Sequence, residues 1–218
     1  MPPISKRWKM GNINKIFNTE VFFSDGNSKM GAVASVSLPP VESCINCKEC
    51  SKKCYAKRMY NRLPIVKKQY DSNLELLHND RKKYFEDIGT VLKYTRFFRW
   101  HVSGDIVDYD YFANMVRLAK ENTDCVQLAF TKNYDVVNNY LASDQEIPEN
   151  LHILFSVWKD TPYNNPYNIP ECHIKYKDGE TTAGSEYKEC DGNCFMCFFD
   201  CKGCIGLKSG EKIVINEH

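Results

Sequence analysis

Nine of the eleven cysteines of this chain fall into two short runs, and thiols grouped in this way are typical of metal-binding proteins. The first run, spaced C-x2-C-x2-C-x3-C, consists of Cys44, Cys47, Cys50 and Cys54. The second run, spaced C-x3-C-x2-C-x3-C-x2-C, consists of Cys190, Cys194, Cys197, Cys201 and Cys204. These spacings could serve three kinds of chemistry: disulfides, structural zinc, or iron–sulfur clusters.

Disulfides and zinc fit the two runs less well than clusters do. Disulfides suit secreted chains, whereas Met1–Met10 is polar and basic and does not resemble a secretory signal. Zinc usually takes two C-x2-C pairs separated by a longer loop. Only three residues separate Cys194/Cys197 from Cys201/Cys204, and the first run has no second pair. Zinc remains an alternative.

Iron–sulfur chemistry fits best because the first run has the ferredoxin spacing, with Tyr55 where ferredoxins have proline. The nine clustered thiolates could supply two four-cysteine sites with one spare, or leave one iron without a protein ligand. We therefore expect two 4Fe–4S clusters, with all nine cysteines of the runs as candidate ligands. Cys125 lies in an apolar stretch and is interpreted as a buried hydrophobe. Cys172 could be an additional ligand.

Composition limits the classes of partner. The chain is 43% hydrophobic and 26% charged, as globular proteins are, and its 29 basic and 28 acidic residues give a net charge of +1. That balance gives no general electrostatic reason to expect nucleic acid or an anionic membrane, although a local basic face is not excluded. No stretch approaches the roughly 20 apolar residues of a membrane span. We expect a cytoplasmic protein.

The pattern along the chain predicts an α/β fold with a parallel sheet. Residues 19–38 read as a hairpin or two strands, and Ser72-Asn73 is expected to cap a helix that extends to Leu92. Strands and helices then alternate, which is typical of β-α-β units. The expected strands are 97–102, 126–130, 151–157, 173–176 and 213–215, and the expected helices are 57–62, 109–120 and 134–141.

We interpret this pattern as an open or partial parallel β/α barrel over residues 1–160, with a cluster loop at 44–54. Residues 161–218 are expected to form a small, loop-rich, cysteine-rich lobe that folds over the rim and ends in a strand. The carboxyl ends of parallel strands share one edge, where α/β barrels carry their chemistry. The first run and the segments 103–105, 131–132 and 158–160 each follow a strand and should meet there.

Three side chains near that edge are candidate catalytic residues. His101 could be a ligand or proton carrier, or simply a hydrogen-bonded histidine inside the barrel. Asp105 could bind a ligand or cap a turn, with Asp108 as the rival cap of the next helix. Lys132 could bind a carboxylate or phosphate, or be a solvated loop lysine.

Three segments resemble the phage protein family of gene product 88: Cys50-Ser-Lys-Lys-Cys54-Tyr-Ala-Lys, Arg99-Trp-His-Val-Ser-Gly-Asp105 and Phe130-Thr-Lys132. The resemblance covers roughly residues 30–160. That family is similar in pattern to radical SAM proteins, which implies an incomplete parallel barrel with a cluster loop after the first strand. One iron without a protein ligand would bind S-adenosylmethionine.

The resemblance implies that Ser103, Gly104 and Asp105 contact the amino group of S-adenosylmethionine. Gly104 would let backbone approach the ligand, and Asp105 could pair with its ammonium. The sequence departs from the radical SAM pattern in its cysteines. The usual spacing is C-x3-C-x2-C, whereas Cys47, Cys50 and Cys54 have the reverse, and Cys44 as a fourth ligand would close the open iron.

The leading hypothesis is an iron–sulfur redox enzyme similar to radical SAM oxidoreductases or transferases, with one catalytic and one auxiliary cluster. Its partners would be a small-molecule ligand or S-adenosylmethionine and an electron donor such as a ferredoxin or flavodoxin. One alternative is a non-catalytic electron-transfer or cluster-storage protein. Another is a zinc-stabilised module that binds nucleic acid or protein.

Overall fold

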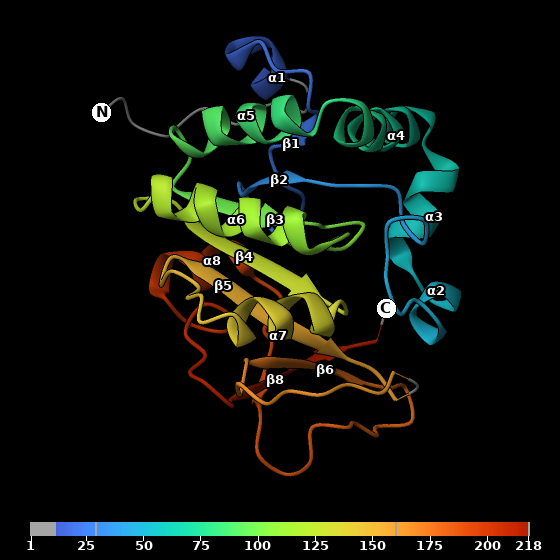
Figure 1. Ribbon diagram of the computed structural model, residues 1–218. Helices are drawn as coiled ribbons and strands as arrows, with labels where there is room; N and C mark the ends of the chain where they lie inside the picture. Colours follow the sequence, from blue (N-terminus) through green and yellow to red (C-terminus); the bar gives the residue numbers. More distant parts are fainter. Residues whose placement is uncertain (1–11, 29, 160, 218) are drawn as a thin grey trace.

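The computed structural model describes residues 12–28, 30–159 and 161–217 (Figure 1). The predicted basic N-terminus, Met1–Met10, lies outside these ranges. The helices are α1 (Asn12–Phe17), α2 (Glu49–Lys52), α3 (Tyr55–Arg62), α4 (Pro64–Asn79), α5 (Arg81–Leu92), α6 (Tyr109–Glu121), α7 (Tyr134–Ala142) and α8 (Cys194–Asp200). The strands are β1 (Phe23–Ser24), β2 (Ala34–Val36), β3 (Phe97–Trp100), β4 (Val126–Thr131), β5 (Leu151–Val157), β6 (Glu171–Lys175), β7 (Lys188–Glu189) and β8 (Lys212–Asn216).

The strands form one eight-stranded sheet in the order β1-β2-β3-β4-β5-β6-β8-β7. Only β1 runs antiparallel to its neighbour, and all other pairs are parallel. In the described part of the chain, β1 and β7 are the edge strands, each of two residues, and the sheet is not closed. The predicted α/β class and parallel sheet are confirmed.

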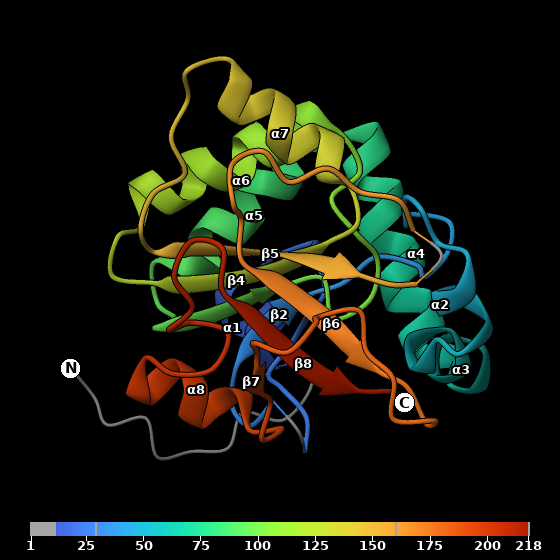
Figure 2. The ribbon, with the colours of Figure 1, turned by 90° about the horizontal axis from the view of Figure 1, so that it is seen from below.

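The helices α4 to α7 cover one face of the sheet (Figure 2). Successive side chains of a strand point to opposite faces, so Phe98 and Trp100 of β3 face these helices and Phe97 and Arg99 face away. Phe98 and Trp100 are fully buried in the core that the helices share with the sheet. This core holds most of the buried aromatic side chains and fixes the positions of the strand ends.

A smaller apolar core lies on the opposite face, beneath α8. Phe198 of α8 packs on Phe97 with ring centroids 5.2 Å apart, and Leu128 and Leu154 belong to the same core. The strands β6, β7 and β8 come from residues 161–217 and extend the sheet that the earlier residues begin. The proposed division at residue 160 stays a prediction.

One expected helix boundary is wrong. The segment predicted to start at Ser72-Asn73 belongs to two helices, α4 and α5. Asn73 lies inside α4, where its side chain accepts a hydrogen bond from Phe22 N (2.7 Å) and donates to Ser37 O (3.0 Å). Asp80 is the actual cap of α5, accepting from Lys83 N at 2.9 Å. Asparagine is common at helix caps, but here the Asn73 amide forms hydrogen bonds with backbone groups of two neighbouring segments.

None of the helices in the described ranges is both long and apolar enough to cross a membrane. This finding agrees with the expectation that the chain does not span a bilayer.

Candidate metal centres

Three thiols of the first run lie together between β2 and α3, two of them in the loop after β2 and the third, Cys50, in α2. Cys47 Sγ lies 3.3 Å from Cys50 Sγ, and Cys44 is hydrogen-bonded to Cys47. That hydrogen bond lowers the pKa of Cys44 and raises the pKa of Cys47. Cys44, Cys47 and Cys50 are called the three-thiol group below.

The fourth thiol of the first run has a different environment. Cys54 is the N-cap of α3, and its Sγ accepts a hydrogen bond from Lys57 N at 3.4 Å. The hydroxyl of the next residue, Tyr55, donates a hydrogen bond to Val102 O at 2.9 Å and so connects the start of α3 to the loop after β3. The run is therefore divided into three thiols and one, a division that its spacing alone did not reveal.

Asp105 connects the loops that follow β3 and β4. Its Oδ1 accepts hydrogen bonds from Ile106 N (2.7 Å) and Thr131 Oγ1 (2.6 Å), and its Oδ2 accepts from Lys132 N (2.9 Å). The residue is 4% exposed, and burial raises the pKa of its carboxyl. These contacts occupy the carboxylate, so Asp105 positions Lys132. Asp108 is the cap of α6, the role that the sequence offered as an alternative, and it accepts a hydrogen bond from Tyr111 N at 2.8 Å.

Lys132 is half-buried beside the three-thiol group. Burial alone would lower the pKa of its ammonium, but Cys50, Asp105, Cys44 and Cys47 together raise it. Its Nζ lies 5.4 Å from the centre of the Trp158 ring, and its carbonyl accepts a hydrogen bond from Asn46 Nδ2 at 2.9 Å. The positive charge of Lys132 therefore lowers the pKa of Cys44, while the nearby carboxylate of Asp105 raises it.

The Ser103-Gly104 segment packs closely on the chain that leads into the first run. Ser103 O accepts a hydrogen bond from Leu38 N at 3.0 Å. Gly104 has φ +89°, and a Cβ there would lie 2.8 Å from Leu38 Cβ and 2.7 Å from Ser43 Oγ. The close backbone approach at Gly104 is thus made with Leu38 and Ser43.

His101 lies on the helix side of the sheet. The residue is 4% exposed and its backbone has φ +53°. Its ring packs against Trp100 and Tyr111. Among the described residues, neither ring nitrogen has a hydrogen-bond partner. Burial lowers its pKa to about 3, so the ring is neutral near pH 7. The structure brings Asp105 and Lys132 together with the three-thiol group, but the ring contacts of His101 are in the helix-side core.

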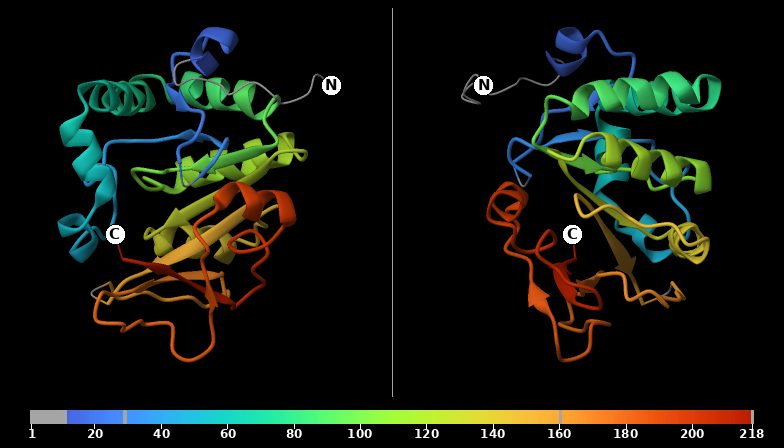
Figure 3. Two further views of the ribbon diagram at one scale, coloured as in Figure 1. Left: turned by 180° about the vertical axis from the view of Figure 1, so that it is seen from behind. Right: turned by 60° about the vertical axis from the view of Figure 1, so that its left-hand side comes forward.

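The second run crosses the face of the sheet opposite α4 to α7. Cys190, Cys194 and Cys204 pack against the smaller core. Cys197 Sγ lies 3.9 Å from Asp191 Oδ1, and Cys201 is exposed at the end of α8. The expectation that this lobe folds over the rim is wrong for α8, because its apolar side chains pack on the start of β3. Figure 3 shows α8 and the helices α2 and α3 at opposite ends of the sheet.

Two further residues lie near the second run: Cys172, which the sequence offered as a possible additional ligand, and Arg99, which was missed as a site residue. Cys172 of β6 is fully buried in the smaller core, and Arg99 Nη1 of β3 lies 3.9 Å from Cys194 Sγ. The guanidinium of Arg99 also lies over the Phe130 ring at 4.6 Å. An arginine inside an otherwise apolar strand is the signal that could have identified this position, because buried charges need a partner.

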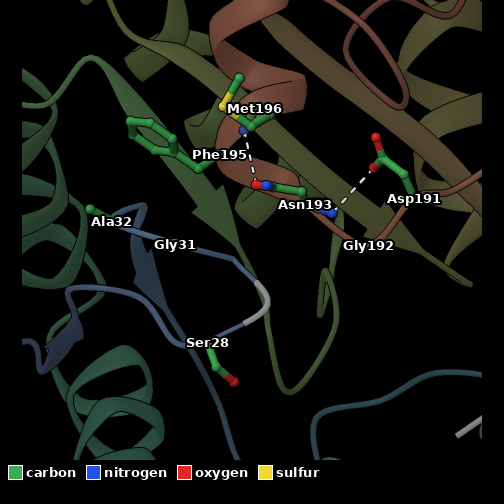
Figure 4. Close-up of a pocket in the computed structure, with 8 residues that line it drawn as sticks. All are labelled: Ser28, Gly31, Ala32, Asp191, Gly192, Asn193, Phe195 and Met196. Carbon is green, nitrogen blue, oxygen red and sulfur yellow. Dashed lines mark hydrogen bonds between the residues drawn. The ribbon is translucent and has the colours of Figure 1, made fainter.

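Each thiol region adjoins a cavity. One of about 500 Å³ lies beside the second run and is lined by residues of the loop after β1 and of the start of α8, including Gly31, Asp191 and Phe195 (Figure 4). Another of about 460 Å³ lies at the carboxyl ends of the strands, where Trp158 and Tyr176 contribute to its walls. Glu49 and Lys53, on either side of Cys50, line the second cavity.

The donor groups fit thiophilic metals. All eleven cysteines are free thiols, so none is used in a disulfide. A tetrahedral zinc ion with bonds of ~2.3 Å separates its thiolates by about 3.8 Å, close to the 3.3 Å between Cys47 and Cys50. Within the described ranges, no three His, Cys, Asp or Glu side chains surround one point closely enough for a single ion. A cluster is wider than an ion and uses thiolates that stand further apart.

Comparison with known proteins gives one match. The profile of the family described as gene product 88 matches residues 7–190. No curated protein and no solved structure matches the chain. The matched region includes the first cysteine run, Asp105, Lys132 and β1 to β7, and it ends at the first cysteine of the second run. The chain therefore belongs to the phage protein family of gene product 88.

Proposed function

We propose that this protein is an iron–sulfur redox enzyme of the radical SAM type. The three-thiol group would hold a 4Fe–4S cluster with one iron free of protein ligands. The observation that carries this proposal is the division of the first run, in which Cys54 caps α3 while the other three thiols lie together. Three thiolates leave one iron of a four-iron cluster open to a small molecule.

The strand order supports a partial-barrel interpretation of the sheet. Its parallel strands β2, β3, β4, β5, β6 and β8 are adjacent in chain order, and α4 to α7 lie on one face. A doubly wound sheet would reverse its strand order and carry helices on both faces. Sequential order with the helices α4 to α7 on one face is the arrangement from which a β/α barrel is built, although α8 lies on the other face.

The residues at the carboxyl ends of the strands would bind and orient the ligand of the open iron. The Lys132 ammonium would pair with an anionic group such as a carboxylate, and Asp105 would hold Lys132 through its backbone. The cavity lined by Trp158 and Tyr176 would shelter the rest of the bound ligand from water. A bound cluster would supply an electron to the ligand at its open iron.

The second run would hold an auxiliary 4Fe–4S cluster that relays electrons or binds substrate. Arg99 lies beside Cys194 and would offset part of the negative charge of such a cluster. A ferredoxin or flavodoxin would be the external electron donor. S-adenosylmethionine is the ligand that the radical SAM resemblance implies.

Anaerobic purification followed by iron and acid-labile sulfide analysis tests the proposal. We expect about eight irons and eight sulfides per chain, and an EPR signal of the reduced protein that changes when S-adenosylmethionine is added. Cys44→Ala, Cys47→Ala and Cys50→Ala should each abolish that change, whereas Cys54→Ala should retain it.

Two results would replace the proposal with another function. An EPR signal that S-adenosylmethionine leaves unchanged, in a protein with full iron, would favour electron transfer or cluster storage. Zinc without iron or labile sulfide would favour the zinc-stabilised binding module, which the short Cys47–Cys50 distance could accommodate.

A further inference from the structure

Cys172 is a thiol that belongs to neither run, yet it lies under the second run. It is fully buried at the second position of β6, and its side chain is in the smaller core. Cys190, Cys194 and Cys204 pack against that same core. Cys172 and three thiols of the second run therefore border one apolar region of the sheet face.

Backbone pairing fixes two of these thiols relative to each other. Cys172 is paired with Ile213 of β8, and the next residue of β8, Val214, accepts a hydrogen bond from Cys190 N at 2.9 Å. The position of Cys190 therefore depends on the sheet itself. Cys194 and Cys204 are positioned through α8 and through Ile205, which is buried in the same core.

The thiols are close enough to influence one another electrostatically. Burial raises the pKa of Cys204, and charges on Cys172, Cys190 and Cys194 would raise it further. Arg99 acts in the opposite direction on Cys172, Cys190 and Cys204. Burial is the largest influence and leaves the pKa of all three thiols above the ordinary value, and Arg99 offsets part of that rise.

Arg99 is a second, independent indication that this region takes an anionic group. Its Nη1 lies near Cys194 Sγ, while its Nε is buried and has no hydrogen-bond partner among the described residues. A guanidinium held on an apolar sheet face by a thiol and the Phe130 ring lacks a full counter-charge. An anionic metal–thiolate centre would supply it.

We propose that Cys172, Cys190, Cys194 and Cys204, the sheet-face group, form the ligand set of the auxiliary 4Fe–4S cluster, with Arg99 beside it. This inference rests on the proposed function, and it replaces the expectation that the second run alone binds the cluster. Cys201 is then a free surface thiol, and Cys197 borders the site near Asp191. The cluster joins β6 to the loop that follows β7 and to α8.

Alanine variants with a matched control test the ligand set. Cys172→Ala should lower iron and labile sulfide by about half, from about eight to about four of each per chain, as should Cys204→Ala. Cys125→Ala is the control, because Cys125 is equally buried but lies near Thr95 in the helix-side core. Cys125→Ala and Cys201→Ala should retain full iron.

The outcomes separate this inference from the proposed function. If Cys172→Ala keeps full iron and the wild-type EPR and Mössbauer spectra, the ligand set is wrong while the enzyme proposal stands. If the wild-type protein binds no iron, the proposed function fails. Far-UV circular dichroism checks that each variant is folded. In Cys172→Ala, an S-adenosylmethionine-dependent EPR change at the remaining cluster would show that the three-thiol group is intact.

Discussion

Each thiol region has one basic side chain held beside it by the fold. Lys132 faces the three-thiol group after β4, and Arg99 points from β3 toward Cys194. The two cations differ in how they are fixed. The backbone of Lys132 is bound by Asp105 and Asn46, whereas Arg99 is fixed by the pleat of its strand and by Phe130. Positive charge is thus built into both regions before any metal is bound.

The contacts of Asp105 make it a stability determinant. Asp105→Asn replaces one of the two acceptor oxygens, so a buried backbone or hydroxyl donor loses its partner. We expect the free energy of unfolding to fall by about 1–3 kcal/mol. Urea denaturation measures it, with Thr131→Val as the comparison that removes the Thr131 hydroxyl, which donates to Asp105 and accepts from Asn133 N. Equal stability of Asp105→Asn and wild type would contradict this assignment.

His101 should make the fold sensitive to acid. Its pKa is about 3 when folded and about 6.5 when unfolded, so between these values only the unfolded state binds the proton. Stability should therefore fall as pH drops from 6.5 toward 3, by up to about 1.4 kcal/mol per pH unit. His101→Asn tolerates the positive φ and should weaken this dependence. His78→Asn, at an exposed position, should not; a similar acid response in both variants would count against His101.

At the residue scale, sequence reasoning found the chemical groups but not their partners. Cysteine, Asp105 and Lys132 were identifiable from residue type and position after a strand. The contact of Asp105 with Thr131 joins residues 26 apart in the chain, and local patterns carry no information about it. Arg99 became a site residue, and Cys172 gained neighbouring thiols, only when β3 and β6 were placed in one sheet.

At the element scale, the alternating strands and helices were easier to predict than the helices before them. The strands β4 and β5 and the helices α6 and α7 all lie within one residue of their predicted bounds. The break between α4 and α5 depends on Asp80, a cap inside a long polar and apolar pattern. The helix α8 was missed because five of its seven residues are cysteine or aromatic and suggested only a metal-binding loop.

The cap of α6 yields a test at this scale. Asp108 accepts from Tyr111 N and binds Arg81 through both carboxylate oxygens, at 2.9 Å and 2.7 Å. Asp108→Ala should destabilise the protein by about 1–2 kcal/mol, because it removes both the cap and this link to α5. Thermal unfolding measures the loss. Asp110→Ala, in the same first turn but without a capping contact, is the control and should have the smaller effect.

At the scale of the whole molecule, the helix-side core and the thiol-bearing segments are separate. The large core between the sheet and α4 to α7 contains neither cysteine run. The alternation of strands and helices predicted this layer correctly. It did not predict that α8 crosses the opposite face, because no local pattern specifies which surface a C-terminal segment covers.

Metal removal should therefore loosen the thiol segments and leave the large core folded. Hydrogen–deuterium exchange of anaerobic protein before and after chelation should increase in residues 44–54 and 190–205. Exchange in β3, β4 and β5 should stay slow, because their packing is apolar. Uniform loss of protection over the whole chain would show instead that the metal centres hold the sheet together.

The two outermost strands, β1 and β7, have only two residues each. Each edge of the sheet therefore offers very few unpaired peptide groups to a second copy of the protein. Edge-to-edge pairing of strands into fibrils is disfavoured. Self-association of this protein in air should accordingly proceed through oxidation of its surface thiols, and a reductant should reverse it.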